Sequence, residues 1–264
     1  MALKTPRLGC VKYLNARPLI HDWPGPVTFD YPSTLCAQLA RGEIDIAFVS
    51  SFEFLRNPIY RIVDDVCIAS DGPVYSVVLA HAGELSEIEE IKLDPTSETS
   101  VNLLRCFLAE RGLKPRVVPG SAGYQPFVDG SLPATPNAWL LIGDRAIGFR
   151  QEHENEFHFW DLGEAWKKLI DLPFVYALWL IRPDVADATA IAGDLRALRD
   201  QNLRNIDNLV SQQTRFSPDF CRRYYRENLR FNFGEREKRG LRAFADLCAR
   251  HGLLAQGDLV FDTV

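Results

Sequence analysis

Hydroxyl side chains gather where a short apolar run gives way to a helix. Ser97, Thr99 and Ser100 follow the apolar residues 91–93 and a turn at 94–96, and a helix with apolar spacing begins near residue 99. The first N–H groups of a helix have no partner within the helix, so such a junction can bind a carboxylate or a phosphate. Serine and threonine also cap helices that bind nothing. The residues alone therefore leave a ligand site and a plain helix cap open.

Polar residues follow other apolar runs in the same way. Asn15 comes after a predicted strand at 8–11, Ser50 after one at 44–49, and Asp144 after a third. An amide offers donors and an acceptor, and a carboxylate can act as a base. Each of these residues can also cap the helix that follows it. Because ligands of α/β folds bind outside the carboxyl ends of the strands, we expect these junctions to share one site.

The order of the predicted elements indicates an α/β protein with a helical end. Strands and helices alternate up to residue 181, and Ser76 lies within a predicted strand at 74–80. An irregular loop is predicted at 120–136, where glycine, proline and serine are frequent. After residue 181, helices are predicted without an intervening strand, at 187–212, 218–228 and 234–251. Two sheet-containing lobes followed by a helical segment fit this order.

Composition excludes several classes of protein. The chain has 264 residues, of which 47% are hydrophobic, enough for a full core over most of its length. A formal net charge of -5 and a pI of about 5.6 argue against a general nucleic-acid-binding protein. Six cysteines contain no C-x-x-C pair, and we expect them to be reduced and buried. No metal-ligand cluster, phosphate loop or dinucleotide motif is recognisable, so we expect neither a metal nor a cofactor.

The amino-terminal residues do not have the pattern of an export signal. Leu8, Gly9 and Cys10 have the order found at a lipoprotein cleavage site, but Pro6 and Arg7 interrupt the apolar stretch that export requires. No window approaches the roughly 18 consecutive apolar residues of a membrane helix. We therefore expect a cytoplasmic protein without a membrane partner.

Several segments resemble, in the same order and at similar spacing, the chorismate dehydratases of the futalosine route to menaquinone. They are VKYLNARPL, GEIDIAFVSSFEFL, ASDGPVYSVVL, LDPTSETSVNLL, LLIGDRAI, DLGEAWKKLIDLPFVYALW and LRFNFGEREKRGLRAF. The match runs from about Leu8 to Leu253. Ile170 and Asp171 depart from the usual Thr-Gly of the family, and Arg17 stands where a small or apolar residue is common.

The resemblance implies a periplasmic-binding-protein-like fold of type II, with two α/β lobes, an interlobe cleft and a helical C-terminal segment. Residues 1–80 and 178–264 are then expected to form lobe one, and residues 81–177 to form lobe two. The oligomeric state stays open between a monomer and a homodimer.

The activity that the resemblance implies is the removal of water from chorismate to give 3-[(1-carboxyvinyl)oxy]benzoate. This product is aromatic, so the thermodynamic drive lies in the substrate itself. If the ring hydrogen leaves first, negative charge accumulates on the ring carboxylate. Uncharged donors at Ser97, Thr99 and Ser100 are suited to bind that carboxylate, and to bind it more strongly as the charge develops.

The other polar junctions are expected to hold the second end of the substrate. We expect Asn15 and Ser50 to contact the enolpyruvyl carboxylate or the leaving hydroxyl, and Ser76 to bind near the hinge of the cleft. Two groups remain open as the base, Asp144 and the enolpyruvyl carboxylate of the substrate, and we favour the substrate. Arg17 either adds a cation beside the ligand or is a surface arginine.

Two other functions remain possible at this point. A non-catalytic binding protein for a small carboxylate ligand would have the same fold and the same cleft chemistry. The effector-binding domain of a transcription regulator would need an attached helix-turn-helix, and few residues precede the first predicted strand.

Overall fold

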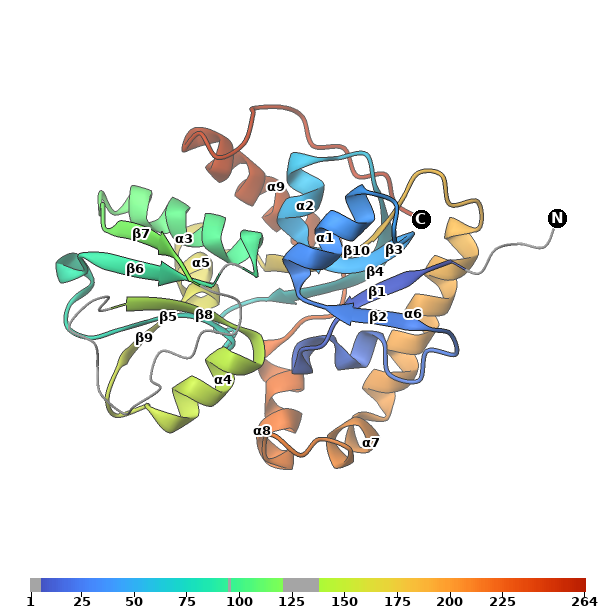
Figure 1. Ribbon diagram of the computed structural model, residues 1–264, viewed down its shortest axis with the longest axis horizontal. Coiled ribbons are helices and arrows are strands. Elements are labelled where there is room, and N and C mark those ends of the chain that lie inside the picture. Colours follow the sequence, from blue (N-terminus) through green and yellow to red (C-terminus); the bar gives the residue numbers. More distant parts are fainter. Residues whose placement is uncertain (1–5, 95, 121–137) are drawn as a thin grey trace.

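Two five-stranded mixed sheets carry the architecture of the protein, whose structure, a computed structural model, describes residues 6–94, 96–120 and 138–264. The first sheet has the order β2 (Val27–Asp30), β1 (Leu8–Val11), β3 (Ile46–Ser50), β10 (Phe174–Ile181) and β4 (Arg61–Ser70). The second has the order β7 (Arg116–Pro119), β6 (Glu90–Leu93), β8 (Ala138–Ile142), β5 (Val77–His81) and β9 (His158–Asp161). The sheets lie side by side, each with helices around it (Figure 1). The predicted α/β class is confirmed.

The described helices and helical turns fall into two groups along the chain. Those between strands are η1 (Leu14–Leu19), α1 (Pro32–Ala40), α2 (Ser51–Arg56), η2 (Leu85–Glu87), α3 (Glu98–Glu110), α4 (Gly143–Glu152) and α5 (Leu162–Ile170). Those after the last strand are α6 (Ala188–Arg204), α7 (Ile206–Ser211), α8 (Pro218–Arg223), the π turn η3 (Tyr224–Asn228) and α9 (Glu235–Arg250). In this second group, α6 contacts η1 and β4, whereas α9 contacts β10 and α3.

The chain passes between the sheets twice. β4 belongs to the first sheet and β5 to the second, and the chain returns between α5 and β10. The lobe boundaries predicted at 80/81 and 177/178 fall inside β5 and β10, whereas the chain leaves the first sheet after Ser70 and returns to it at Phe174. The division into lobes stays a prediction, and we propose boundaries at 71–76 and 171–173 instead.

The C-terminal helices are more divided than the apolar periodicity predicted. The segment 187–212 breaks at Asn205, whose side-chain amide donates to the carbonyl oxygen of Gln201 at 3.0 Å. Such a bond competes with the helical hydrogen bonds that would continue the helix. The segment 218–228 changes from an α-helix to a π turn at Tyr224. Apolar spacing continues across both changes, so periodicity did not reveal them.

Two shorter elements also differ from the sequence prediction. Asn15, which was expected to precede a helix that it could cap, lies within the 3-10 helix Leu14–Leu19 instead. The strand expected at 74–80 begins only at Val77, so Ser76 precedes the strand rather than lying within it. The reason is Tyr75, whose positive φ of 66° interrupts extended backbone directly before Ser76.

Three further predictions concern the cysteines, membrane-spanning helices, and the predicted turn and loop. All six cysteines are free and buried, as predicted. Among the described residues, no helix is both long enough and apolar enough to span a membrane. Residue 95 of the predicted turn and residues 121–136 of the predicted loop lie outside the described part of the chain.

An aromatic cluster fixes α9 against the return crossover. Phe174 of β10 lies 5.0 Å from the ring of Trp166 and 4.9 Å from the ring of Phe244. These rings belong to α5, β10 and α9, so they join the last helix to the point where the chain re-enters the first sheet. Gly240 of α9 contacts the same crossover, and a Cβ atom there would overlap the carbonyl oxygen of Pro173.

We therefore predict that Gly240→Ala lowers the free energy of unfolding by about 1–3 kcal/mol, because the backbone must move to admit the methyl group. Urea denaturation measures the change. Gly193→Ala in α6 is the matched control, since a Cβ atom at Gly193 meets nothing within 4 Å. The control should raise stability by about 0.5–1 kcal/mol, as alanine favours a helix over glycine. Equal effects of the two substitutions would contradict the close approach of α9 to Pro173.

Candidate functional site

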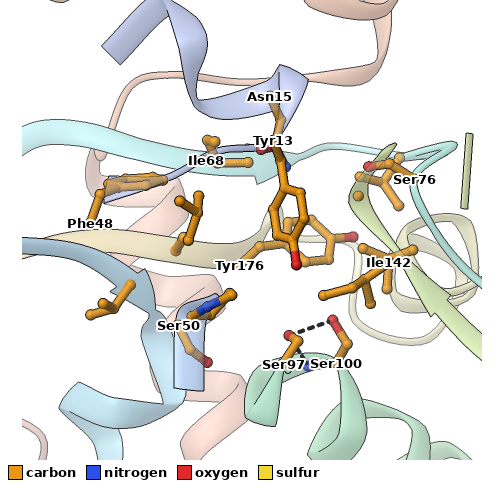
Figure 2. Close-up of a pocket in the computed structure, with 17 residues that line it drawn as sticks. Tyr13, Asn15, Phe48, Ser50, Ile68, Ser76, Ser97, Ser100, Ile142 and Tyr176 are labelled. Atoms are coloured by element: carbon orange, nitrogen blue, oxygen red, sulfur yellow. Dashed lines mark hydrogen bonds between the residues drawn. The ribbon is translucent and has the colours of Figure 1, made fainter. Parts of the chain in front are cut away.

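A cavity lies where strands of the two sheets end, beside the return strand β10 (Figure 2). It holds about 530 Å³ of space not filled by atoms, part of it open to solvent. Its walls are largely apolar, with Phe48, Ile68 and Ile142 among the lining residues. The predicted site residues that line it are Asn15, Ser50, Ser76, Ser97 and Ser100.

The polar lining residues lie on different sides of this apolar space. In Figure 2, Asn15 and Ser76 lie on one side, while Ser97 and Ser100 lie on the opposite side at the start of α3. Thr99 and Asp144 are not among the lining residues. The structure thus gathers the predicted serines and Asn15 around one cavity, and it gives Thr99 and Asp144 other contacts.

Thr99 joins the two sheets through Ser50. The Thr99 N–H donates to Ser50 Oγ at 3.0 Å, and the two hydroxyls are also hydrogen bonded to each other. Thr99 Oγ1 further accepts the N–H of Phe52 at 3.1 Å. Both Ser50 and Thr99 are buried, where an unpaired polar group is costly. Thr99 therefore positions Ser50, the residue of this pair that faces the cavity.

At the start of α3, the donors available to a ligand are side-chain hydroxyls rather than backbone N–H groups. Ser97 caps the helix, because its Oγ accepts the Ser100 N–H at 3.3 Å. Ser97 also donates its hydroxyl hydrogen to Ser100 Oγ at 3.0 Å. The Ser100 hydroxyl hydrogen is therefore left for a ligand, while the N–H groups of Thr99 and Ser100 already have protein acceptors. The positive end of the helix dipole still favours an anion at this place.

Asn15 has an acceptor that the protein does not satisfy. It lies in η1, directly after β1, and its Oδ1 is buried without a hydrogen-bond partner among the described residues. Leaving a buried polar atom unpaired costs about 1–3 kcal/mol. Such an atom beside a cavity is available to a ligand that donates a hydrogen bond, for instance a hydroxyl group.

Tyr13 stands between the two sheets at the cavity and was not predicted as a site residue. Its hydroxyl lies 3.4 Å from Thr96 Oγ1. Thr96 donates its own hydrogen to Asp94 at 2.5 Å, so Tyr13 is the donor to Thr96. The ring faces Gly143, where a Cβ atom would come to 3.0 Å of it. Burial raises the pKa of Tyr13 to about 12, so the hydroxyl stays protonated near neutral pH.

Asp144 holds α4 to η1. Its Oδ1 accepts the Leu14 N–H at 2.7 Å, and its Oδ2 lies 3.8 Å from a guanidinium nitrogen of Arg215. Burial raises the pKa of the Asp144 carboxyl, and the bond from Leu14 lowers it in part. Arg17, the residue that departs from the family pattern, lines a neighbouring hollow beside η1 and β2 rather than this cavity.

Asp161 organises the first crossover and was also missed. It ends β9, and its carboxylate accepts the backbone N–H groups of Val74, Tyr75, Gly163 and Glu164 at 2.8–3.1 Å. The segment that presents Ser76 to the cavity is therefore held by one buried side chain. The sequence motif containing this aspartate was recognised, but its partners lie far away in the chain.

Titratable side chains are scarce around the cavity. Among the described lining residues, only Tyr13 and Tyr176 can ionise, and none is a carboxylate, an imidazole or an amine. Burial raises the pKa of Tyr176 well above its usual value. No group of three histidine, cysteine, aspartate or glutamate side chains that could bind a metal occurs in the described ranges. The cavity is therefore suited to bind with neutral hydroxyl and amide groups.

Comparison of the structure with known structures identifies the fold. It matches a crystal structure from Archaeoglobus fulgidus with a TM-score of 0.72 and 17% identity, covering 94% of this chain and 98% of that one. It matches the alkanesulfonate-binding protein from Xanthomonas axonopodis pv. citri bound to MOPS with a TM-score of 0.66 and 17% identity, covering 95% and 94%. A Candida albicans protein with the generic periplasmic binding protein fold matches with a TM-score of 0.62 and 11% identity, covering 97% and 92%. The predicted periplasmic-binding-protein-like fold is confirmed.

Sequence comparison then gives the family. A family model described as menaquinone biosynthesis matches residues 6–250, and this chain belongs to that family. The chorismate dehydratase of Thermus thermophilus is 30% identical over 260 residues, which cover 90% of this chain and 93% of that protein. The family predicted from the sequence motifs is confirmed.

The contact between Asp144 and Leu14 predicts a difference between two substitutions. Asp144→Ala should lower the free energy of unfolding by about 1–2 kcal/mol, because the Leu14 N–H loses its acceptor. Asp144→Asn should change it by less than about 0.5 kcal/mol at pH 7, because the amide oxygen still accepts and no charge is buried. Urea denaturation at pH 7 measures both. Equal losses in the two variants would show that the charge, and not the hydrogen bond, joins α4 to η1.

Proposed function

We propose that this protein is a chorismate dehydratase, which removes water from chorismate to give 3-[(1-carboxyvinyl)oxy]benzoate. Membership of the menaquinone biosynthesis family and the 30% identical Thermus thermophilus chorismate dehydratase support this activity. The observation that carries the proposal is the cavity itself. It combines apolar walls with uncharged polar groups on two opposite sides, which suits a flat ring with polar substituents at separate positions.

The ring carboxylate of the substrate is proposed to lie at the start of α3. The Ser100 hydroxyl, oriented by Ser97, donates to it, and the helix dipole favours its charge. These donors are neutral, so they add no fixed countercharge. As the ring hydrogen leaves and charge moves onto this carboxylate, each hydrogen bond strengthens. Interactions that strengthen towards the transition state accelerate the reaction, whereas equal binding of both states does not.

The reaction proceeds in two steps in this proposal. The proton leaves the ring carbon that carries the ether, and the electron pair of that C–H bond spreads through the neighbouring double bond to the ring carboxylate. The pair then forms the new ring double bond as the C–O bond to the hydroxyl breaks. The hydroxyl group takes up the proton and departs as water, which leaves an aromatic ring. Asn15 and Ser76 are proposed to contact this leaving group, because both line the same side of the cavity.

The enolpyruvyl carboxylate of the substrate is the proposed base. It is attached through the ether oxygen to the carbon that loses the proton, so it is close to that hydrogen in the bound molecule. Tyr13 and Tyr176 have raised pKa values and are poor bases in their protonated form. Asp144 is bound to the Leu14 N–H and is not among the residues that line the cavity. Asp144 is therefore assigned to holding η1, which carries Asn15.

Incubation with chorismate tests the proposed function directly. We expect chorismate to be consumed and a product lighter by one water molecule to appear in the mass spectrum, together with new aromatic absorbance. Asn15→Ala should lower kcat/KM by about 10²-fold or more, as expected when one preorganised polar contact is removed. Asn208→Ala on the exposed face of α7 is the matched control and should leave the rate unchanged. Binding of chorismate without conversion would instead indicate a binding protein for a small carboxylate.

The choice of base makes a separate prediction for Asp144→Asn. If the substrate carboxylate takes the proton, kcat for chorismate should stay within about 3-fold of the parent protein, since the amide still accepts from Leu14. Steady-state kinetics under saturating chorismate measure this. A loss of several decades in kcat with chorismate affinity unchanged would make Asp144 the base.

A further inference from the structure

A buried tyrosine from the C-terminal segment reaches the cavity wall. Tyr224 is the first residue of the π turn η3 and is 0% exposed. Its hydroxyl donates to Ser76 Oγ at 2.6 Å, across 148 positions of sequence. π turns within helices are rare and occur frequently at functional sites. Neither Tyr224 nor its contact was expected from the sequence.

The bond from Tyr224 determines what Ser76 can offer a ligand. A serine hydroxyl has one hydrogen to donate and lone pairs with which to accept. Because Ser76 Oγ accepts from Tyr224, its own hydrogen remains to be donated. No acceptor for this hydrogen occurs among the described residues, and Ser76 lines the cavity. The Ser76 hydroxyl is therefore set to donate to a ligand.

The backbone before Ser76 is held in an unusual conformation. Tyr75 has a φ of 66°, which a bulky side chain rarely adopts. Its N–H is bound by Asp161 at 2.8 Å, and its ring lies 4.3 Å from the Arg150 guanidinium and 5.2 Å from the ring of Phe220. Such strain persists only where the surroundings enforce it, and it is concentrated at functional sites. The position of Ser76 is thus fixed by the held backbone of Tyr75 before it and by the hydrogen bond from Tyr224.

The same C-terminal segment supplies several of these contacts. The ring of Tyr224 stacks on Phe220 at 5.7 Å and 12°, and Phe220 in turn contacts Tyr75. The next residue, Tyr225, donates its hydroxyl to the carbonyl oxygen of Leu14 at 3.0 Å, directly before Asn15. Burial raises the pKa of Tyr224 far above its usual value, so its hydroxyl stays protonated near neutral pH and can donate a hydrogen bond.

We propose that Tyr224 is a positioning residue that orients the Ser76 hydroxyl to donate a hydrogen bond to the leaving hydroxyl group of the substrate. This inference rests on the proposed function. As the C–O bond breaks, the departing oxygen gains negative charge, and a donor fixed in advance stabilises that charge. The effect therefore falls on kcat more than on KM.

A double-mutant cycle between Tyr224→Phe and Ser76→Ala tests this assignment. Tyr224→Phe alone should lower kcat for chorismate about 10-fold with KM changed less than about 3-fold, and Ser76→Ala should lower it at least as much. In the Ser76→Ala background, Tyr224→Phe should have no further effect on kcat. A merely structural role of Tyr224 would give the same loss of kcat in both backgrounds, and that result overturns the proposal.

Tyr225→Phe is the matched control, because Tyr225 donates to a backbone carbonyl and not to Ser76. Its effect on kcat should be the same with and without Ser76→Ala. Ser76→Cys tests the arrangement without any change at Tyr224, should Tyr224→Phe fail to fold. A thiol is a weak donor and acceptor, so kcat should fall about 10-fold or more. An unchanged kcat in Ser76→Cys overturns the proposal.

Failure of the proposed function is distinguishable from failure of this inference. If the parent protein binds chorismate without converting it, the dehydratase function fails. The same cycle is then measured on the dissociation constant of chorismate by calorimetry. Loss of the Tyr224→Phe effect in the Ser76→Ala background supports the orientation of Ser76, and equal effects in both backgrounds overturn it.

Discussion

Hydrogen bonds between buried groups of the two sheets determine where the cavity forms. Thr99 at the start of α3 is bound to Ser50 at the end of β3, and both residues are buried. Breaking such a contact leaves a buried donor or acceptor unpaired, at a cost of about 1–3 kcal/mol for each group. Tyr13 adds a bond to Thr96 near the same place. These bonds hold two strand ends together, and the polar residues beside them become the walls of one site.

The carboxylates near the cavity already have hydrogen-bond donors or cations of the protein as partners. Asp161 is surrounded by backbone N–H groups, Asp144 accepts from Leu14, and Asp94 accepts from Thr96 and lies 3.3 Å from a nitrogen of Arg145. A ligand with two carboxylates therefore meets hydroxyl and amide groups rather than unpaired anions. A fixed cation would bind substrate and transition state almost equally, whereas neutral donors respond to charge that develops during the reaction. This difference would let a cavity without an ionisable base accelerate the proposed elimination.

The sequence predicted the elements with local signals well. The strand predicted before Asp144 is present as β8, and the hydroxyl-rich junction at 97–100 is the capped start of α3. Ordered motifs also predicted the family and the fold. Thr99 and Asp144 show the limit of this reasoning, because a residue type at a strand end does not reveal the direction in which its side chain points.

The missed residues depend on contacts between distant parts of the chain. Tyr224 meets Ser76 across 148 positions, and Asp161 meets Val74 across 87. In sequence, an aromatic residue at helical spacing looks like part of the core, and Tyr224 is indeed buried. Its hydroxyl group is what gives it a second role, and only the fold shows where that hydroxyl lies. The same is true of Tyr13, whose ring and hydroxyl lie against Gly143 and Thr96, just beyond the ends of two strands of the second sheet.

The pH dependence of kcat for chorismate tests most directly whether a neutral cavity lets the substrate act as its own base. The substrate carboxylates ionise at about pH 3 to 4. The pKa of Tyr13 is about 12, and that of Tyr176 is also raised. Neither the substrate carboxylates nor these two tyrosines, the ionisable residues among the described lining of the cavity, change their charge between about pH 6 and pH 9, so kcat should be constant over that range. A rise or fall of kcat with an apparent pKa inside it would show that an ionising side chain of the enzyme moves the proton, and would contradict the account.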